Sequence, residues 1–223
     1  MKKVILTGAT GMVGKGVLFE CLEHDSIEEV LVIGRNELGM NHPKLKEIIH
    51  KDFTSFENIK DKLTGYDACF FCLGISAAGL KEEQYKKITY DFTMALAKTL
   101  LSLNSDMTFN FVSGVGTDST EKGRAMWARV KGKTENDLLK LGFKNSFMFR
   151  PGAIIPERGI KSRTKMYQFI YDYFMWLVKL IKAISPDSVV TTTQIGQAMI
   201  NSVFEGYTKD ILEPVDIIVL SET

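Results

Sequence analysis

Short apolar runs alternate along the chain with longer segments in which apolar residues recur every three or four positions. The runs are typical of buried strands, because they are rich in β-branched and aromatic residues and end at turn residues. The expected strands are KVILTG, VLVIG, EIIHKDF, DACFFCLG, MTFNFVSG and SFMFRPG, in that order. Helical spacing is found over residues 12–24, 57–63, 82–103 and 122–141.

This alternation predicts parallel strands joined by right-handed crossover helices, which is a doubly wound α/β sheet with helices on both faces. In such sheets ligands bind beyond the carboxyl ends of the strands, near the point where strand order reverses. The residues expected at that edge, each just after a strand, are Gly8, Gly34, Gly74, Ser113 and Pro151.

The composition excludes several classes of protein. Hydrophobic residues make up 45% of the 223 positions and charged residues 25%, which is ordinary for a globular protein. A formal net charge of +1 argues against binding of nucleic acid by phosphate neutralisation. Three cysteines in apolar stretches predict no disulfide framework, and the first apolar run is too short for a signal peptide, so we expect a cytoplasmic location.

The stretch TGATGMVG places Gly8, Gly11 and Gly14 between the first strand and the first helix. Glycine there permits positive φ angles and lets the backbone approach a diphosphate closely. The helix N-terminus adds unpaired N–H groups and a partial positive charge. A tight turn alone also needs glycine, but this position in the chain favours binding of a dinucleotide.

The end of the second predicted strand bears on the choice of cofactor. NAD-binding folds place an acid about twenty residues beyond the glycines, on the ribose hydroxyls. Here the strand ends VIGRN, with Arg35 at that place and no acid before Glu37. A guanidinium can bind a 2′-phosphate and stack on adenine. We therefore predict NADP (NADPH) in preference to NAD; the alternative is an exposed arginine without a ligand.

Further motifs extend this pattern. TGATGMVG, VIGRN, CFFCLG, FNFVSGVGTD, VKGKTE and FRPGAIIP occur in this order. In them the chain resembles the short-chain dehydrogenase/reductases, most of all the atypical branch that contains the Tat-interacting, oxidoreductase-like tumour suppressor and its bacterial relatives. The resemblance implies an NADP-binding Rossmann core over residues 1–155. It also implies a small C-terminal region over 156–223, a helical lid with short strands, packed on the core as one structural unit.

The resemblance also assigns cofactor contacts by matching position. The residues that would wrap the diphosphate are Gly8, Thr10, Gly11, Met12, Val13 and Gly14. Arg35 would bind the 2′-phosphate, and the residues that would border the adenine are Asp52 and Phe53. Those that would line the adenosine ribose are Cys72, Leu73 and Gly74, and those that would touch the nicotinamide are Pro151, Gly152 and Ile154.

Carbonyl-reducing members of this family use a serine after the fifth strand and a Tyr-x-x-x-Lys on the next helix. The tyrosine gives a proton to the developing alkoxide, and the lysine lowers its pKa and holds the nicotinamide ribose. The serine hydrogen-bonds the carbonyl oxygen. By resemblance Ser113 and Lys131 hold the serine and lysine positions, but Trp127 replaces the tyrosine. An indole N–H donates a hydrogen bond and does not release its proton near neutral pH.

Three hypotheses about function follow. The first is an NADP-dependent oxidoreductase that acts on a small or lipophilic acceptor, with a proton from Tyr85, Asp118, a bound water or solvent. The second is a non-catalytic NADP-binding regulator or sensor that binds a partner. The third is an enzyme like the nucleotide-sugar epimerases, which would need the missing base and a larger C-terminal domain.

Other patterns favour structural roles. Cys69 and Cys72 lie three apart in a predicted strand and so face opposite ways, and the three histidines lie apart, so we expect no metal site. Residues 166–184 have apolar positions at helical spacing and predict a helix that lines the pocket, a partner surface or a membrane-surface contact. Asp172 and two lysines interrupt this segment, so we expect no transmembrane span there. A homodimer through the long helices stays open.

Overall fold

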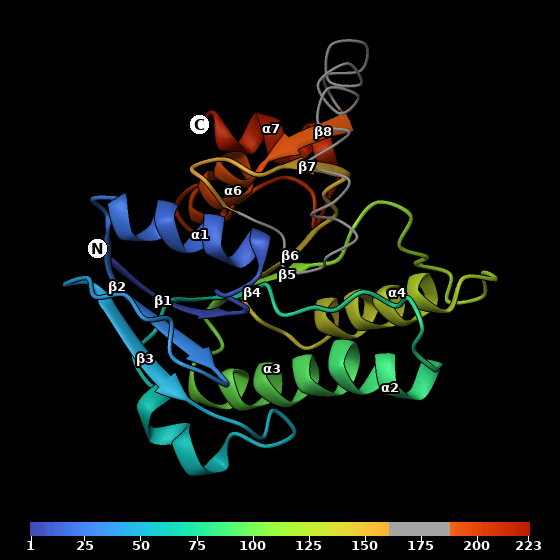
Figure 1. Ribbon diagram of the computed structural model, residues 1–223, viewed down its shortest axis with the longest axis horizontal. Helices are drawn as coiled ribbons and strands as arrows, with labels where there is room; N and C mark the ends of the chain where they lie inside the picture. The colour runs from blue at the N-terminus through green and yellow to red at the C-terminus, as the bar shows by residue number, and fades with distance from the viewer. Residues whose placement is uncertain (161–187) are drawn as a thin grey trace.

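The structure is a computed structural model that describes residues 1–160 and 188–223. A parallel sheet of seven strands lies between two layers of helices (Figure 1). The strand order is β3-β2-β1-β4-β5-β6-β9, and every neighbouring pair is parallel. The order reverses between β1 and β4, so the predicted doubly wound α/β fold is confirmed.

The strands of this sheet are β1 (Lys2–Thr7), β2 (Ile27–Gly34), β3 (Leu45–Ile49), β4 (Ala68–Phe71), β5 (Thr108–Val112), β6 (Asn145–Phe149) and β9 (Ile211–Leu212). A separate parallel pair consists of β7 (Ala153–Ile155) and β8 (Val189–Thr191). The helices are α1 (Met12–Glu23), the 3-10 helix η1 (Glu57–Leu63), α2 (Glu82–Lys86), the π segment η2 (Lys87–Asp91), α3 (Phe92–Leu103), α4 (Met126–Leu139), α6 (Thr192–Phe204) and α7 (Pro214–Ser221).

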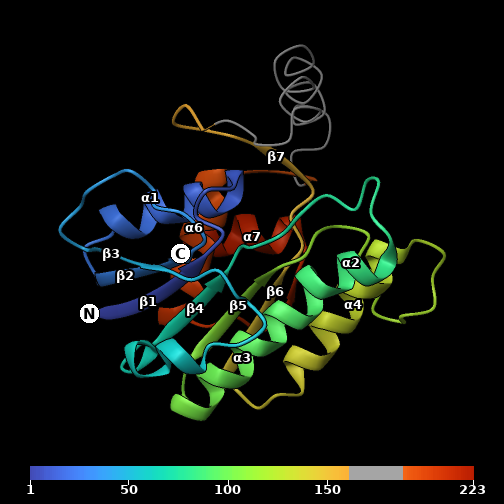
Figure 2. The ribbon, with the colours of Figure 1, turned by 60° about the horizontal axis from the view of Figure 1, so that its bottom comes forward.

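Alternate residues of the strands face opposite helical layers. In β1, Val4 and Leu6 join the apolar cluster beneath α1, α6 and α7, whereas Ile5 joins the cluster beneath η1, α3 and α4. All three side chains are fully buried, as expected for strands covered on both faces. Figure 2 shows α2, α3 and α4 along one face of the sheet, with α1, α6 and α7 on the other.

Two predicted boundaries are wrong. The third strand ends at Ile49 and does not reach Phe53, and helix α4 begins at Met126 and not at about Lys122. The Asp118 carboxylate accepts hydrogen bonds from the Thr120 and Gly123 amides at 3.0 and 2.6 Å, which closes a turn ahead of the helix. Such local side-chain bonds compete with helical ones, so the turn replaces the first predicted helical residues.

Residues 188–223 join the same sheet and the same helical layer. Strand β9 pairs with β6, and α6 packs closely on α1. A Cβ at Gly16 would lie 2.6 Å from the Thr192 Cβ, and one at Gly196 would lie 2.5 Å from the Glu20 Cγ, so small residues bring these helices together. The predicted apolar helix over 166–184 lies outside the described residues, and the division at residue 155 stays a prediction.

Candidate cofactor and active site

The loops after β1, β4, β5 and β6 meet at the carboxyl edge of the sheet. A Cβ at Gly8 would lie 2.5 Å from the Cys72 carbonyl carbon and 2.6 Å from the Leu73 amide nitrogen. Farther along, the Val115 amide donates to the Pro151 carbonyl oxygen at 3.1 Å. The structure therefore brings together the predicted diphosphate, ribose and nicotinamide residues from separate parts of the chain.

The glycine loop presents an open helix N-terminus. Gly11 is the N-cap of α1 and makes no side-chain cap, and the first turn contains no acidic residue. A Cβ at Gly11 would meet only the Gly8 carbonyl oxygen, at 3.3 Å. The first N–H groups of a helix have no partner within the helix. This glycine cradle, with its positive helix end, fits a diphosphate.

At the expected adenosine end, Arg35 is exposed directly after β2, and among the described residues its guanidinium forms no ion pair. The exposed Asp52 carboxylate accepts from the Thr54 hydroxyl at 2.5 Å and the Thr54 amide at 2.9 Å. These bonds lower the pKa of Asp52. Phe53 is only 2% exposed and packs against Phe56 and Phe92, so its ring is not available to stack on a ligand.

At the expected nicotinamide end, the Lys131 ammonium donates to the carbonyl oxygen of Ser113. A Cβ at Gly114 would lie 3.8 Å from the Lys131 Nζ, so the lysine reaches the loop after β5. Burial lowers the pKa of Lys131 to about 8, and the negative charge of Glu135 acts in the opposite direction. Near neutral pH the side chain is therefore mainly an ammonium.

The Ser113 hydroxyl points inward. It donates to the Glu135 carboxylate and lies 3.1 Å from the Phe149 carbonyl oxygen. A hydroxyl has one hydrogen to donate, and here two protein acceptors compete for it. In this arrangement Ser113 has no hydrogen left for a substrate carbonyl.

A buried ion pair that the sequence pattern did not predict lies behind Ser113. The Glu135 side chain is fully buried, and its two oxygens accept from the Nε of Arg150, at 3.0 Å, and from the Nη2 of the same guanidinium. Arg150 also donates to the Ser119 hydroxyl at 2.6 Å and to Glu213 at 3.3 Å, and the bond to Glu135 raises its pKa. The available signal was a glutamate on the predicted helix, in VKGKTE, and an arginine at the end of the sixth predicted strand, in FRPG.

Trp127 lies one helical turn before Lys131, and Glu135 lies one turn after it, so the three share a face of α4. A Cβ at Gly116, where φ is +84°, would lie 3.2 Å from the Trp127 Cη2. The indole therefore packs on the loop after β5, at the position where a reductase of this family has its phenol.

Two suggested substitutes for that phenol have other roles. Tyr85 is 2% exposed and so lies out of reach of a ligand. Asp118 accepts from the Thr120 hydroxyl at 2.6 Å and from the Gly123 amide, and these bonds lower its pKa. A carboxyl with a lowered pKa is ionised near neutral pH and has no proton to give.

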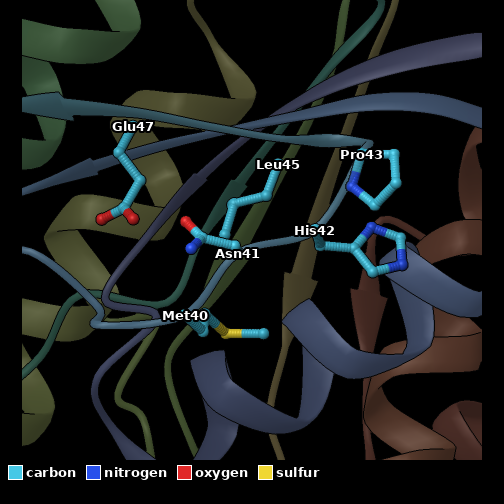
Figure 3. Close-up of a pocket in the computed structure, with 6 residues that line it drawn as sticks. All are labelled: Met40, Asn41, His42, Pro43, Leu45 and Glu47. Carbon is cyan, nitrogen blue, oxygen red and sulfur yellow. The ribbon is translucent and has the colours of Figure 1, made fainter.

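A surface cavity lies elsewhere, beside the edge strand β3 (Figure 3). Its volume is about 340 Å³, and it is lined by Met40, Asn41, His42, Pro43, Leu45 and Glu47. None of these residues belongs to the predicted site.

In the part of the chain that the structure describes, no helix is both long and apolar enough to cross a bilayer.

The sheet and the glycine cradle define the class of Rossmann-type dinucleotide-binding proteins. Residues 4–133 match the model of the NAD dependent epimerase/dehydratase family, which is more than half of the 223 residues. The chain belongs to this family, whose members bind NAD(P).

The protein HTATIP2 of Rattus norvegicus is 26% identical over 159 residues, which cover 70% of this chain and 64% of the rat protein. The match thus spans just under two thirds of that relative. The mitochondrial protein FMP52 of Candida albicans is 27% identical over 157 residues, covering 69% of this chain and 67% of FMP52. Because this relative is named mitochondrial, the cytoplasmic location stays a prediction.

A short chain dehydrogenase family protein from Francisella tularensis has a similar fold. Its TM-score is 0.70 at 16% identity, and the superposition covers 96% of both chains. Together with the two relatives, this likeness confirms the resemblance to atypical short-chain dehydrogenase/reductases.

Proposed function

We propose that the chain is an NADP-dependent oxidoreductase that transfers hydride between NADPH and a small lipophilic acceptor without a tyrosine. The position of Lys131 carries the proposal. Its ammonium lies against the loop after β5, one turn from the tyrosine position, and in family enzymes that lysine holds the nicotinamide ribose. The exposed Arg35 after β2 supports NADP over NAD, because a guanidinium binds a 2′-phosphate well.

The side chains at the expected nicotinamide end of the site favour an apolar acceptor. Val115 is 49% exposed, and a Cβ at Gly152 would lie 3.6 Å from its Cγ2. The Trp127 indole adds a second apolar surface next to it, on Gly116. With Ser113 turned inward, a quinone or another conjugated acceptor fits best, because its product takes a proton from solvent.

The non-catalytic alternative also rests on a specific observation. Both hydroxyl donors of the reductase set are lacking, since Trp127 replaces one and Glu135 holds the other. A chain with this site could bind NADPH as a sensor or regulator without turnover. The site does not favour an epimerase. Epimerisation needs a base at the position that Trp127 occupies.

The deciding experiment measures binding and consumption of NADPH with a panel of quinones and aldehydes. We expect consumption with quinones, at least a tenfold loss in Lys131→Ala, and near-normal rates in Lys133→Ala. Lys133 is the matched control, because it is on the same helix and pairs with Asp137 at 2.8 Å. NADPH should bind more tightly than NADH, and Arg35→Ala should remove that difference. Tight binding without turnover would support the sensor, and binding of neither nucleotide would contradict both proposals.

A further inference from the structure

A chain of polar groups, buried as far as Arg150, connects the candidate site to the last helix, α7. It runs from the Ser113 hydroxyl to Glu135, from Glu135 to Arg150, and from Arg150 to Glu213, the N-cap of α7. Glu135 is fully buried, and its Oε1 accepts two bonds while its Oε2 accepts one. A buried carboxylate with partners on both oxygens has one orientation, and removing a partner is costly.

We infer that Glu135, held by Arg150, is a positioning residue for the nicotinamide end of the site, where it turns the Ser113 hydroxyl inward and supplies the negative charge that faces Lys131. Its importance for hydride transfer rests on the proposed function, whereas its effect on Lys131 rests on their spacing of one turn on α4 and on the contact that each makes with Ser113. The role would explain why a carboxylate is buried one helical turn from a lysine that already bonds a backbone carbonyl.

Two other carboxylates near α4 have separate partners. Glu82 on α2 pairs with Arg129 at 2.7 Å, and Asp137 pairs with Lys133 on another face of α4. Tyr90 on η2 also donates to Asp137, at 2.7 Å. Glu135 is the charged group whose field opposes the effect of burial on Lys131. Without that charge, a smaller fraction of Lys131 should be an ammonium at a given pH.

The test follows the titration of Lys131 in the chain without nucleotide, by NMR of lysines labelled at the Cε carbon. The Lys131 signal is assigned from its loss in Lys131→Ala. In the wild-type chain we expect a midpoint pKa of about 8. Glu135→Gln should lower that midpoint by about one pH unit or more, since a close opposite charge is lost. The matched control Asp137→Asn removes a carboxylate from the same helix and should leave the midpoint unchanged.

A second variant keeps the test decisive if Glu135→Gln fails to fold. Glu135→Leu combined with Arg150→Met replaces the whole pair with apolar side chains and leaves no lone buried charge. The midpoint should again fall. An unchanged Lys131 midpoint in both altered chains would overturn the inference.

Binding of NADPH separates this result from a failure of the proposed function. Because the ammonium is the form that hydrogen-bonds ribose hydroxyls, Glu135→Gln should weaken NADPH binding severalfold more at about pH 8.5 than at about pH 6.5. If the wild-type chain bound no NADPH, the proposed function would fail while the NMR titration still decided the role of Glu135. Equal weakening at both pH values would mean that Glu135 does not act through the charge of Lys131.

Discussion

The glycines after β1 have different physical roles. Gly8 has a φ of +75° and lies against the Cys72–Leu73 peptide, and a Cβ at Gly14 would lie 2.3 Å from the Gly8 oxygen. These two are required by the fold. Gly11 has a φ of −81°, and a Cβ there would contact only the Gly8 carbonyl oxygen, at 3.3 Å. The missing side chain of Gly11 therefore leaves space for a ligand.

Alanine substitutions at Gly8 and Gly11 should therefore differ in kind. Gly8→Ala should lower the free energy of unfolding by about 2 kcal/mol or more, through left-handed strain and overlap with backbone. Gly11→Ala should cost about 1 kcal/mol or less, yet weaken NADPH binding by about tenfold or more, because its methyl group occupies the diphosphate approach. Urea unfolding and calorimetric titration of both variants give the comparison. Wild-type affinity in Gly11→Ala would argue against this loop as the cofactor site.

Sequence spacing predicted which positions reach the carboxyl edge, but not how each side chain points there. Lys131 and Ser113 follow from the family resemblance, and the structure places them together. The direction of the Ser113 hydrogen depends on Glu135, 22 residues later, and no local pattern contains that information. Phe53 is similar, since its burial depends on contacts with Phe92 from a distant helix.

Helix α4 carries the unusual chemistry of the site on one face. Trp127, Lys131 and Glu135 recur every four residues and so line up along the helix. The close approach of α4 to the preceding loop depends on Gly132, where a Cβ would lie 1.8 Å from the Asp118 carbonyl oxygen. The position of α4 relative to this loop is thus fixed by close packing. A new side chain at position 127 would therefore project beside Lys131.

Trp127→Tyr should consequently create a weak aldehyde reductase. The phenol would stand one turn before the Lys131 ammonium, whose charge lowers a tyrosine pKa and favours proton donation. We expect aldehyde-dependent NADPH consumption to rise by about tenfold or more above the wild-type rate, with the gain limited because Glu135 still holds the Ser113 hydroxyl. Trp127→Phe is the matched control, since it is aromatic without a hydroxyl. Equal rates in the two variants would show that position 127 does not face the reacting carbonyl.

The whole molecule depends on contacts that the sequence pattern could not reveal. Alternation of strands and helices predicted the first six strands along the chain, because each contains an apolar run, the weakest being that of EIIHKDF. Strand β9 has only two residues, Ile211 and Leu212, and is too short to give a periodic signal. Its place beside β6 is set by contacts made by α6 and α7 across the sheet face.

A chain that ends after residue 155 should therefore fail to fold alone. One apolar cluster includes Val4 and Val17 from the N-terminal part together with Ile195, Met199 and Ile217 from the C-terminal part, all at 0% exposure. Without residues 156–223, one face of the sheet and the inner face of α1 would meet water, which removes most of the hydrophobic stabilisation on that side.

We expect residues 1–155 to show no cooperative urea transition in near-ultraviolet circular dichroism, whereas the full chain should unfold in a single step. Mixing separately prepared 1–155 and 156–223 fragments should restore the transition, because the two parts would share one core. A cooperative transition of the 1–155 fragment at the urea midpoint of the full chain would mean that the C-terminal part is an independent appendage. In that case the contacts of α6 with α1 would contribute little to stability, contrary to their close packing through Gly16 and Gly196.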